Sequence, residues 1–455
     1  MDRPTAVSET AHHRQRLRAR YNLPISTQQR ETQRDPGTFN LPLNIVKTGF
    51  AHPGSSNLVN VLVGVIERLG ESEGAGRERV DVPDGLDVRG VEGEWCAWGK
   101  GEEEVRDGVL GEREKWRRMM RDAKRGVGGG VPVMLFVHGG AFYLGNPATS
   151  RPVVAQLVKN TGGLAFSVRY RLAPQHPFPA PILDVIVSYL SLLYPPPGAI
   201  HDPIPASSIV FVGESSGANL CFAALQFILE LGRQSGNRVP KVLFHGREVE
   251  MLVPAGLASV CGMLDLTRSL PSWTRKDDYD LYGAGPGPYL QPDFPKCEAW
   301  PTDPPRGELY CDVSAMCHPL VSPTAAKDWS GSPPLFICVG EERAADCNLV
   351  LARRAAGQGV KVVCEQFEAM PHLFFLLMAG TENVKMCYRD WAGFCRRCVD
   401  ERETMRSESS LVEVQSLKRR AFELDALRLV SYEEALRLMR ARRDAGGTIT
   451  IKAKF

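Results

Sequence analysis

Residues 209–217 read Ile-Val-Phe-Val-Gly-Glu-Ser-Ser-Gly, and this stretch decides the fold. Its first four residues have the apolar pattern of a buried strand, and residues 218–231 continue as a helix-like run. Glycines on both sides of Ser215 allow a tight strand-to-helix turn that lifts the serine hydroxyl above the edge of a sheet. The start of the helix points its free N–H groups at the same place. The stretch therefore marks Ser215 as a candidate nucleophile, with a structural glycine turn as the alternative.

Apolar runs without polar alternation recur along the chain. The other runs that read as buried strands are residues 133–137, 164–168, 335–339 and 361–364. Helix candidates, for example residues 216–232 and 345–357, lie between such runs. Strands of this kind, separated by helices, indicate a mostly parallel central sheet that is covered by helices on both faces. The sequence therefore predicts the α/β class.

A second glycine motif follows the expected strand 133–137, where residues 138–142 read His-Gly-Gly-Ala-Phe. Acyl transfer passes through an oxyanion, and main-chain N–H groups stabilise it best where side chains are small. The pair Gly139 and Gly140 supplies such donors, and the N–H of Ser216, the residue after the candidate nucleophile, would complete the hole. An ordinary Gly-Gly turn is the alternative.

A base and an acid can be assigned from chain order. Nine histidines are present, and only His372 lies downstream of an acidic segment that itself follows an expected strand. That segment, residues 340–346, reads Gly-Glu-Glu-Arg-Ala-Ala-Asp and comes directly after the run 335–339. Because the carboxyl ends of parallel strands share one edge of a sheet, we expect these groups to meet Ser215 there.

Composition excludes several classes of protein. The chain has 455 residues, of which 43% are hydrophobic, enough for a sizeable core and incompatible with wholesale disorder. Its 55 Lys and Arg residues against 53 Asp and Glu residues give a net charge of +2. This balance offers no electrostatic reason to propose nucleic acid as a partner.

Targeting signals and cysteines suggest a compartment. The first 22 residues contain no apolar segment of a secretory signal, and the run 58–66 is shorter than the about 20 apolar residues that span a bilayer. Twelve cysteines are scattered, mostly inside apolar runs, and Cys395 and Cys398 form an isolated CxxC pair. We therefore expect a cytoplasmic protein with reduced thiols, no transmembrane segment, no metal and no cofactor.

Five stretches together resemble the hormone-sensitive-lipase-like branch of the α/β-hydrolase fold, and most of all its fungal esterase-type members. They occur in that family's order and span about residues 85–398. The matching stretches are HGGAF (138–142), YRLAP (170–174) through Asp184, GESSG (213–217), GEERAAD (340–346) and EAMPHLF (368–374).

The resemblance implies roles for individual residues. Ser215 matches the nucleophile and His372 the general base. Glu342 stands at the position of the orienting carboxylate, with Asp346 and Glu341 as alternatives, and Glu is chemically competent for this role. The third glycine of the family's oxyanion motif is replaced by Ala141. The hole would then use two of the N–H groups of residues 139, 140 and 141, together with that of Ser216.

Other positions in the matching stretches are expected to be structural. The residue before the nucleophile is Glu214 where Asp is common in the family, and we expect little consequence. Tyr170, Arg171 and His176 are interpreted as a scaffold under the oxyanion loop.

Residue patterns also divide the chain. Residues 1–84 are expected to form an N-terminal cap or lid, and residues 85–399 the catalytic domain. Within that domain, the charged segment 101–130 reads as a solvated insertion loop. Residues 270–333, rich in Pro, Gly and aromatic residues, read as an insertion that walls a pocket. Residues 400–455 have a helical apolar period and are expected to be appended amphipathic helices.

The expected activity is hydrolysis of carboxylic esters of short or medium acyl chains, such as acetyl esters of a lipid or secondary metabolite. An acyltransferase, cyclase or lactonase would use the same residues, because only the access of water differs. A ligand-binding protein that has the fold and no catalysis is the alternative from another class. The expected partner is a small-molecule ester, and the sequence leaves a homo-oligomer open.

Overall fold

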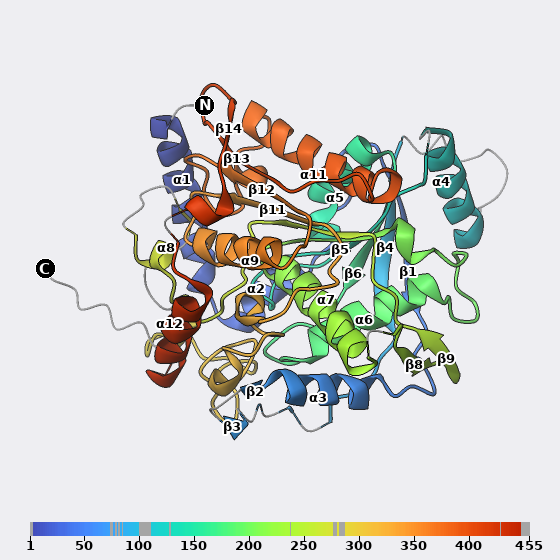
Figure 1. Cartoon of the computed structure of the whole chain (residues 1–455), viewed down its shortest axis with the longest axis horizontal. Helices are drawn as coiled ribbons and strands as arrows, with labels where there is room; N and C mark the ends of the chain where they lie inside the picture. Colours follow the sequence, from blue (N-terminus) through green and yellow to red (C-terminus); the bar gives the residue numbers. More distant parts are fainter. Residues whose placement is uncertain are drawn as a thin grey trace, which may run out of the picture.

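A ten-stranded sheet forms the centre of the computed structural model (Figure 1), in the order β1-β4-β6-β5-β7-β10-β11-β12-β13-β14. The structure describes residues 3–72, 76–77, 80, 82–83, 85–99, 111–126, 129–236, 238–275, 280–281, 287–427 and 429–446. The strands of the sheet are β1 (Leu43–Phe50), β4 (Val91–Trp98), β5 (Val133–Val137), β6 (Leu164–Arg169), β7 (Ile209–Glu214), β10 (Gly256–Val260), β11 (Leu335–Gly340), β12 (Val362–Phe367), β13 (Glu408–Val412) and β14 (Arg419–Ala421).

Neighbouring strands from β6 to β13 run parallel, whereas β4 is antiparallel to both β1 and β6, and β14 is antiparallel to β13. All five predicted strand runs are strands of this sheet. The predicted α/β class and mostly parallel sheet are therefore confirmed.

Helices cover both faces of the sheet, as predicted. The helices of eight residues or more are α1 (Arg3–Tyr21), α2 (Ile25–Thr32), α3 (Leu58–Leu69), α4 (Glu112–Gly126), α5 (Arg151–Thr161), α6 (Ala180–Leu193), α7 (Ser216–Gln234), α9 (Ala345–Gly357), α11 (Glu382–Asp400) and α12 (Tyr432–Asp444). The two predicted helices 216–232 and 345–357 correspond to α7 and α9. No helix among the described residues combines the length and the apolar character needed to cross a lipid bilayer.

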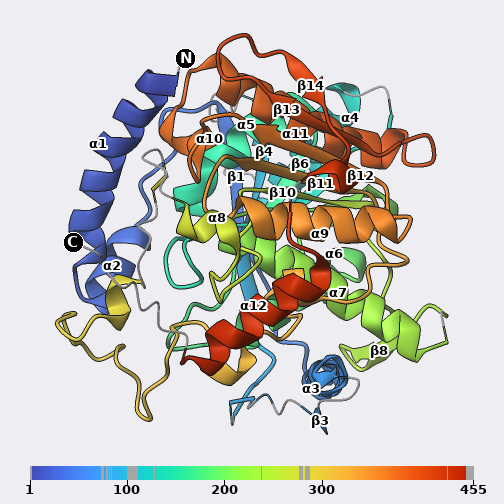
Figure 2. The same cartoon turned by 60° about the vertical axis from the view of Figure 1, so that its left-hand side comes forward.

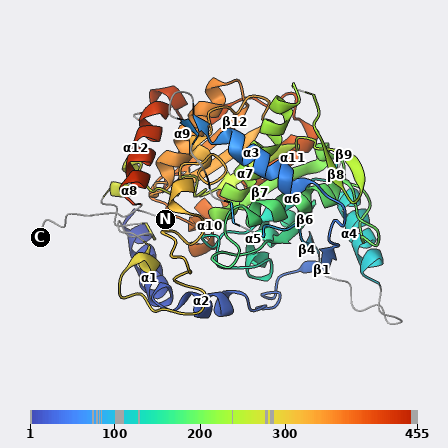
Figure 3. The same ribbon diagram turned by 90° about the horizontal axis from the view of Figure 1, so that it is seen from below.

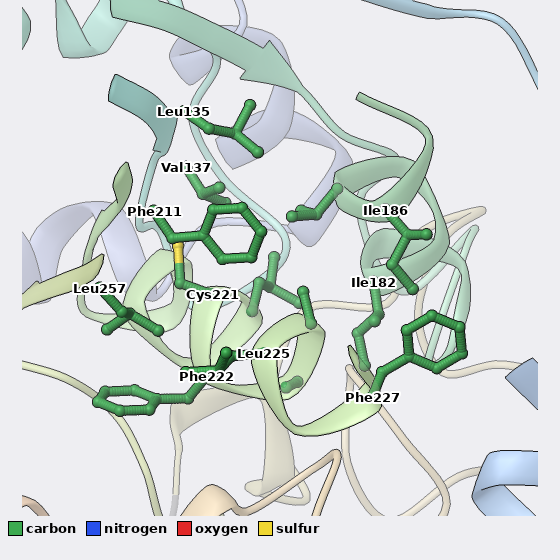
Figure 4. Close-up of a cluster of buried hydrophobic side chains, with 14 of the residues drawn as sticks. Leu135, Val137, Ile182, Ile186, Phe211, Cys221, Phe222, Leu225, Phe227 and Leu257 are labelled. Carbon is green, nitrogen blue, oxygen red and sulfur yellow. The ribbon is translucent and has the colours of Figure 1, made fainter. Parts of the chain in front are cut away.

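Successive residues of β5 point into two different cores. Leu135 and Val137 pack in one cluster with α6 and α7, where Phe211, Ile182 and Leu225 are neighbours (Figure 4). Met134 and Phe136 belong to a second cluster with residues of α5 and α11. Helix α3 crosses the outer side of α6 and α7 (Figure 3). A strand that is buried on both faces needs no polar alternation, which is why the run 133–137 is wholly apolar.

The C-terminal region, residues 400–455, differs from the expected appended amphipathic helices. Strands β13 and β14 extend the sheet, and Leu411, read as part of a helical apolar period, pairs instead with Gln366 of β12. Without β13, strand β12 would end the sheet with unpaired N–H and C=O groups, so the tail covers this edge. Helix α12 does form and packs against α9 (Figure 2), with Tyr432 donating to the carbonyl of Ala325 at 2.9 Å.

Three further expectations are changed or fall outside the described residues. Residues 112–126 of the predicted insertion loop form helix α4, while 101–110 lie outside the described residues. Residues 282–286 and 276–279 of the predicted pocket-walling insertion also lie outside them. In the N-terminal region, β1 pairs with β4 in the main sheet, so residues 43–50 belong to the body of the protein rather than to a separate cap.

Candidate active site

Ser215 occupies a sharp turn between β7 and α7. Its backbone has φ 52° and ψ −121°, an unusual conformation for a residue that carries a side chain. The two glycines of the motif are required by space. A Cβ at Gly213 would lie 2.6 Å from the carbonyl carbon of Gly217, and a Cβ at Gly217 would overlap the carbonyl oxygen of Val137. The Gly-x-Ser-x-Gly pattern is therefore explained by the close approach of α7 to β5 and β7.

His372 and Glu342 meet Ser215 at the carboxyl edge of the sheet. The Oγ of Ser215 donates to Nε2 of His372 across 3.0 Å, and Nδ1 of the same ring is hydrogen-bonded to Oε2 of Glu342. The other oxygen of Glu342 accepts the N–H of Gly340 at 3.2 Å. His372 follows β12 and Glu342 follows β11, two neighbouring parallel strands. The structure thus brings together the three residues that the sequence nominated first.

All three side chains are enclosed. Ser215 is 2% exposed, Glu342 1% and His372 0%. Burial by itself lowers the pKa of His372. The charge and hydrogen bond of Glu342 oppose this, as do the charges of Asp280 and Glu214, and the net direction is upward from 6.5. The site therefore stabilises the imidazolium ion, which is what a histidine needs when it receives a proton from a serine.

The two alternative acids lie elsewhere. The carboxylate of Asp346, in the first turn of α9, accepts the N–H of Ser272 at 2.9 Å and pairs with Arg275 at 2.9 Å. Glu341 accepts the N–H of Ala369 at 3.0 Å. Because both carboxylates are engaged with other groups, Glu342 is the candidate that contacts the imidazole.

The structure reduces the set of N–H groups that can serve as donors in the expected oxyanion hole. The N–H of Gly139 donates to Oε1 of Glu214 at 2.6 Å, so it is already used inside the protein. The expectation that Gly139 is among the donors is corrected accordingly. The N–H groups of Gly140 and Ala141, with that of Ser216 at the start of α7, are left as the expected donors. Gly140 has φ 109° and Ala141 φ 52°, so both residues adopt left-handed conformations in this loop.

The sequence led us to expect little consequence from Glu214 at the position before the nucleophile, but its side chain bonds the oxyanion loop. It is fully enclosed, and burial raises its pKa from 4.5 to about 6, although the Gly139 N–H and the charge of His372 lower it. The only indication of this role in the sequence was the position of Glu214, directly before the candidate nucleophile and at the end of a strand. Its partner, 75 residues earlier in the chain, could not be read from the pattern.

Two of the residues interpreted as scaffold, Tyr170 and Arg171, bond to neighbouring parts of the chain. Tyr170 donates to the carbonyl of His138 at 2.9 Å, and the two rings stack with centroids 4.3 Å apart. Arg171 is bound through its main-chain N–H and its guanidinium to the carboxylate of Asp184. From the N-terminal region, Gln29 of α2 donates to the carbonyl of Ala173 at 2.9 Å. The contact of Tyr170 holds the oxyanion loop directly, whereas those of Arg171 and Gln29 hold residues 171–173 next to it.

One group of side chains in the described part of the chain has the composition of a metal site. The thiol of Cys261 and the ligand atoms of Glu342 and His372 lie within 4.8 Å of one another, all buried. Burial raises the pKa of the Cys261 thiol well above 9.0, and the charge of Glu342 and a hydrogen bond to it act in the same direction. Because the thiol stays protonated and Glu342 is bonded to His372, we assign this group to the hydrogen-bond network of the site.

Comparison with known proteins gives consistent matches. A family model described as the alpha/beta hydrolase fold matches residues 134–376. An acetyl-hydrolase of Streptomyces hygroscopicus is 28% identical over 242 residues, which cover 53% of this chain and 67% of that protein. An esterase of Acinetobacter venetianus is 28% identical over 269 residues, 58% of this chain and 74% of the relative. A crystal structure of a hormone-sensitive lipase from a metagenome library aligns with a TM-score of 0.47 and 24% identity, covering 76% of this chain and 94% of that one.

Proposed function

The chain belongs to the α/β hydrolase fold family, and on that premise we propose that it is a serine carboxylesterase. Ser215 is the nucleophile, His372 the general base, and Glu342 the carboxylate that orients the imidazole. The observation that carries this proposal is the chain of contacts from the Ser215 hydroxyl through both ring nitrogens of His372 to Glu342. This is the arrangement by which a serine hydroxyl is activated at neutral pH.

In the first half of the reaction, Nε2 of His372 takes the proton of the Ser215 hydroxyl while Oγ attacks the ester carbonyl carbon. The carbonyl oxygen becomes an oxyanion, which accepts hydrogen bonds from the main-chain N–H groups of residues 140, 141 and 216. Glu342 stabilises the imidazolium that forms. The intermediate collapses when His372 returns its proton to the alkoxy oxygen, the alcohol leaves, and the acyl group stays on Ser215.

In the second half, a water molecule replaces the alcohol. His372 takes a proton from this water, and the resulting hydroxide attacks the acyl carbon in the same oxyanion hole. The second intermediate releases the carboxylic acid, and His372 returns the proton to Oγ of Ser215. The cycle consumes one water and one ester, and it needs no group other than the residues of this chain.

We propose esters of short acyl chains as substrates, with acetyl esters first. The name of the Streptomyces relative, an acetyl-hydrolase, supports this choice. A lipid or a secondary metabolite carrying an acetyl group is the class of compound that we propose for the alcohol side.

The proposal is tested with a fluorophosphonate probe and p-nitrophenyl acetate, using wild type and Ser215→Ala. We expect wild type to be labelled once and to release p-nitrophenol, and Ser215→Ala to do neither. Absence of both labelling and hydrolysis in the folded wild type would overturn the esterase assignment and favour a ligand-binding protein. Labelling with release of p-nitrophenol only when an acceptor alcohol is present would favour an acyltransferase.

We also propose that the protein works in a reducing compartment such as the cytoplasm. The twelve cysteines, which all lie in the described part of the chain, are in the reduced form, and all but Cys297 are buried. Activity and thermal midpoint are expected to be unchanged by dithiothreitol. A lower midpoint in the reductant would contradict this assignment.

A further inference from the structure

Asp280 is a buried carboxylate that bonds both catalytic loops. It lies in the segment 270–333 and is 0% exposed. Its Oδ2 accepts the N–H of Arg343 at 2.5 Å, and its Oδ1 accepts the N–H of His372 at 3.3 Å. Arg343 is the neighbour of Glu342 in the chain. One carboxylate therefore contacts the main chain at the general base and at the residue next to the acid.

These two contacts act where the catalytic geometry is set. The loop after β11 carries Glu342 and the loop after β12 carries His372, and the imidazole must stand between Ser215 and Glu342. A main-chain bond at His372 fixes the point from which the ring extends, and a bond at Arg343 does the same for the carboxylate. Small displacements of such groups reduce reaction rates strongly, because the reacting atoms must be aligned.

On the basis of the proposed function, we propose that Asp280 is a positioning residue for the catalytic triad. It acts by holding the amides of Arg343 and His372 in place and by presenting a negative charge to the imidazole. It contacts neither the nucleophile nor the reacting atoms.

The charge of Asp280 also faces the base. The titratable groups around His372 in the described part of the chain include the carboxylates of Glu342, Asp280 and Glu214 and the thiol of Cys261. Burial raises the pKa of Asp280, as does the charge of Glu342, whereas the charge of His372 and the two donated N–H bonds lower it. Because both oxygens of Asp280 act as acceptors, the contacts fit the ionised form, which favours the imidazolium state of His372.

The N-terminal helix reaches this network through one side chain. Arg14 of α1 donates from Nε to the main-chain carbonyl of Asp280 at 2.8 Å, and its Nη2 donates to the same oxygen. Helix α1 thus holds the main chain of the residue that bonds both catalytic loops. Removal of this arginine should loosen Asp280 without touching the triad itself.

The primary test is Asp280→Asn, which keeps the shape of the side chain, replaces one accepting oxygen with an NH₂ group and removes the charge. We expect kcat to fall about 10- to 100-fold with KM within about threefold, since substrate contacts are kept. The acid limb of the kcat/KM profile should also move to lower pH, because a charge that raises the pKa of His372 is lost. Active-site titration with the fluorophosphonate probe corrects kcat for the folded fraction.

Asp265→Asn is the matched control. Asp265 is equally buried and accepts the N–H groups of Thr267 at 2.8 Å and Ser269 at 3.2 Å, so its main-chain bonds lie within its own loop and not at Arg343 or His372. This variant is expected to lower the thermal midpoint and to leave the acid limb where it is in wild type. An Asp280→Asn profile with wild-type kcat and an unmoved acid limb would overturn the inference. Failure of wild type itself to hydrolyse the ester would instead overturn the proposed function.

If Asp280→Asn does not fold, Arg14→Ala decides the question, with Arg20→Ala on the same helix as its control. Arg20 makes an exposed ion pair with Glu31 at 3.6 Å. Loss of such a pair costs little stability. We expect Arg14→Ala to reduce kcat about 3- to 10-fold relative to Arg20→Ala at equal folded fraction. Equal kcat values for the two variants would overturn the inference.

Discussion

Oε1 of Glu214 accepts the main-chain N–H of Gly139 at 2.6 Å, and this bond ties the residue before the nucleophile to the first glycine of the oxyanion loop. The contact is enclosed, so a lost acceptor would leave a buried N–H without a partner. For Glu214→Ala we expect a loss of stability of about 1–3 kcal/mol. We also expect kcat to fall about 10- to 100-fold, because the loop that carries the oxyanion donors is released.

Glu214→Gln is the control for that prediction, because its amide oxygen can still accept from Gly139. Its kcat is expected to lie much closer to wild type than to Glu214→Ala, as measured with p-nitrophenyl acetate after active-site titration. Equal losses of kcat in the two variants would show that the bond to the Gly139 N–H does not support catalysis.

The stability of the protein should depend on the ionisation of Glu214. Burial raises the pKa of Glu214 in the folded protein to about 6 from 4.5. Because the folded protein binds the Glu214 proton more tightly than the unfolded chain, protonation of Glu214 stabilises the folded state. This stabilisation is fully present below about pH 4.5 and is lost as the pH rises through 6. Relative to Glu214→Gln, the free energy of unfolding of wild type should fall by about 2 kcal/mol across this range. Urea denaturation of both proteins at several pH values measures it, and a constant difference would contradict the prediction.

The pH profile of catalysis should report the environment of His372. Although burial lowers the pKa of His372, Glu342, Asp280 and Glu214 raise it, and the net shift is upward from 6.5. The base must be neutral to accept the serine proton, so kcat/KM should fall on the acid side with a midpoint above 6.5. Two phenyl esters that do not ionise should give the same midpoint. A midpoint at or below that of free imidazole side chains would contradict the charge arrangement described here.

The identity of the acid can be tested by removing one charge at a time. Glu342→Gln should reduce kcat by a factor on the order of 10⁴, because the neutral amide cannot stabilise the imidazolium and its NH₂ group can donate to Nδ1, which favours the wrong tautomer. Asp346→Asn and Glu341→Gln should keep kcat within about threefold of wild type. Asp346→Asn is expected to lower stability by about 1 kcal/mol through its contacts with Ser272 and Arg275. A wild-type rate for Glu342→Gln would refute the assignment.

Two glycines of the same helix should respond to alanine in opposite ways. A Cβ at Gly217 would overlap the carbonyl oxygen of Val137, so Gly217→Ala should destabilise the protein by about 1–3 kcal/mol or prevent folding. Gly232, near the other end of α7, has nothing within 4 Å of the added carbon. Gly232→Ala should therefore stabilise the protein by about 0.5–1 kcal/mol. Thermal midpoints measure both effects, and a neutral Gly217→Ala would contradict the steric role of the motif.

Much of the fold could be predicted from local patterns. The strands β5, β6, β7, β11 and β12 are buried on both faces, so each is an apolar run that can be recognised by itself. Strands β1 and β4, at one end of the sheet, were not predicted, because both include charged side chains and β1 is only partly buried. Strand β13 was read as helical, because Leu411, Val414 and Leu417 have a helical spacing and nothing local reveals that β12 needs a partner.

The sequence by itself determined the class of the fold, the place of Ser215 at a strand–helix turn, and the short segments that had to contain a base and an acid. These features depend on the spacing of residues close together in the chain, where the geometry of strands and turns limits the outcome. The tertiary structure decided between Glu342, which the resemblance placed first, and its alternatives, and it alone showed that the Gly139 amide is used by Glu214 and that Asp280 bonds both catalytic loops. Each of these is a hydrogen bond between distant parts of the chain, and its existence depends on side-chain directions that only the packed sheet and its loops define.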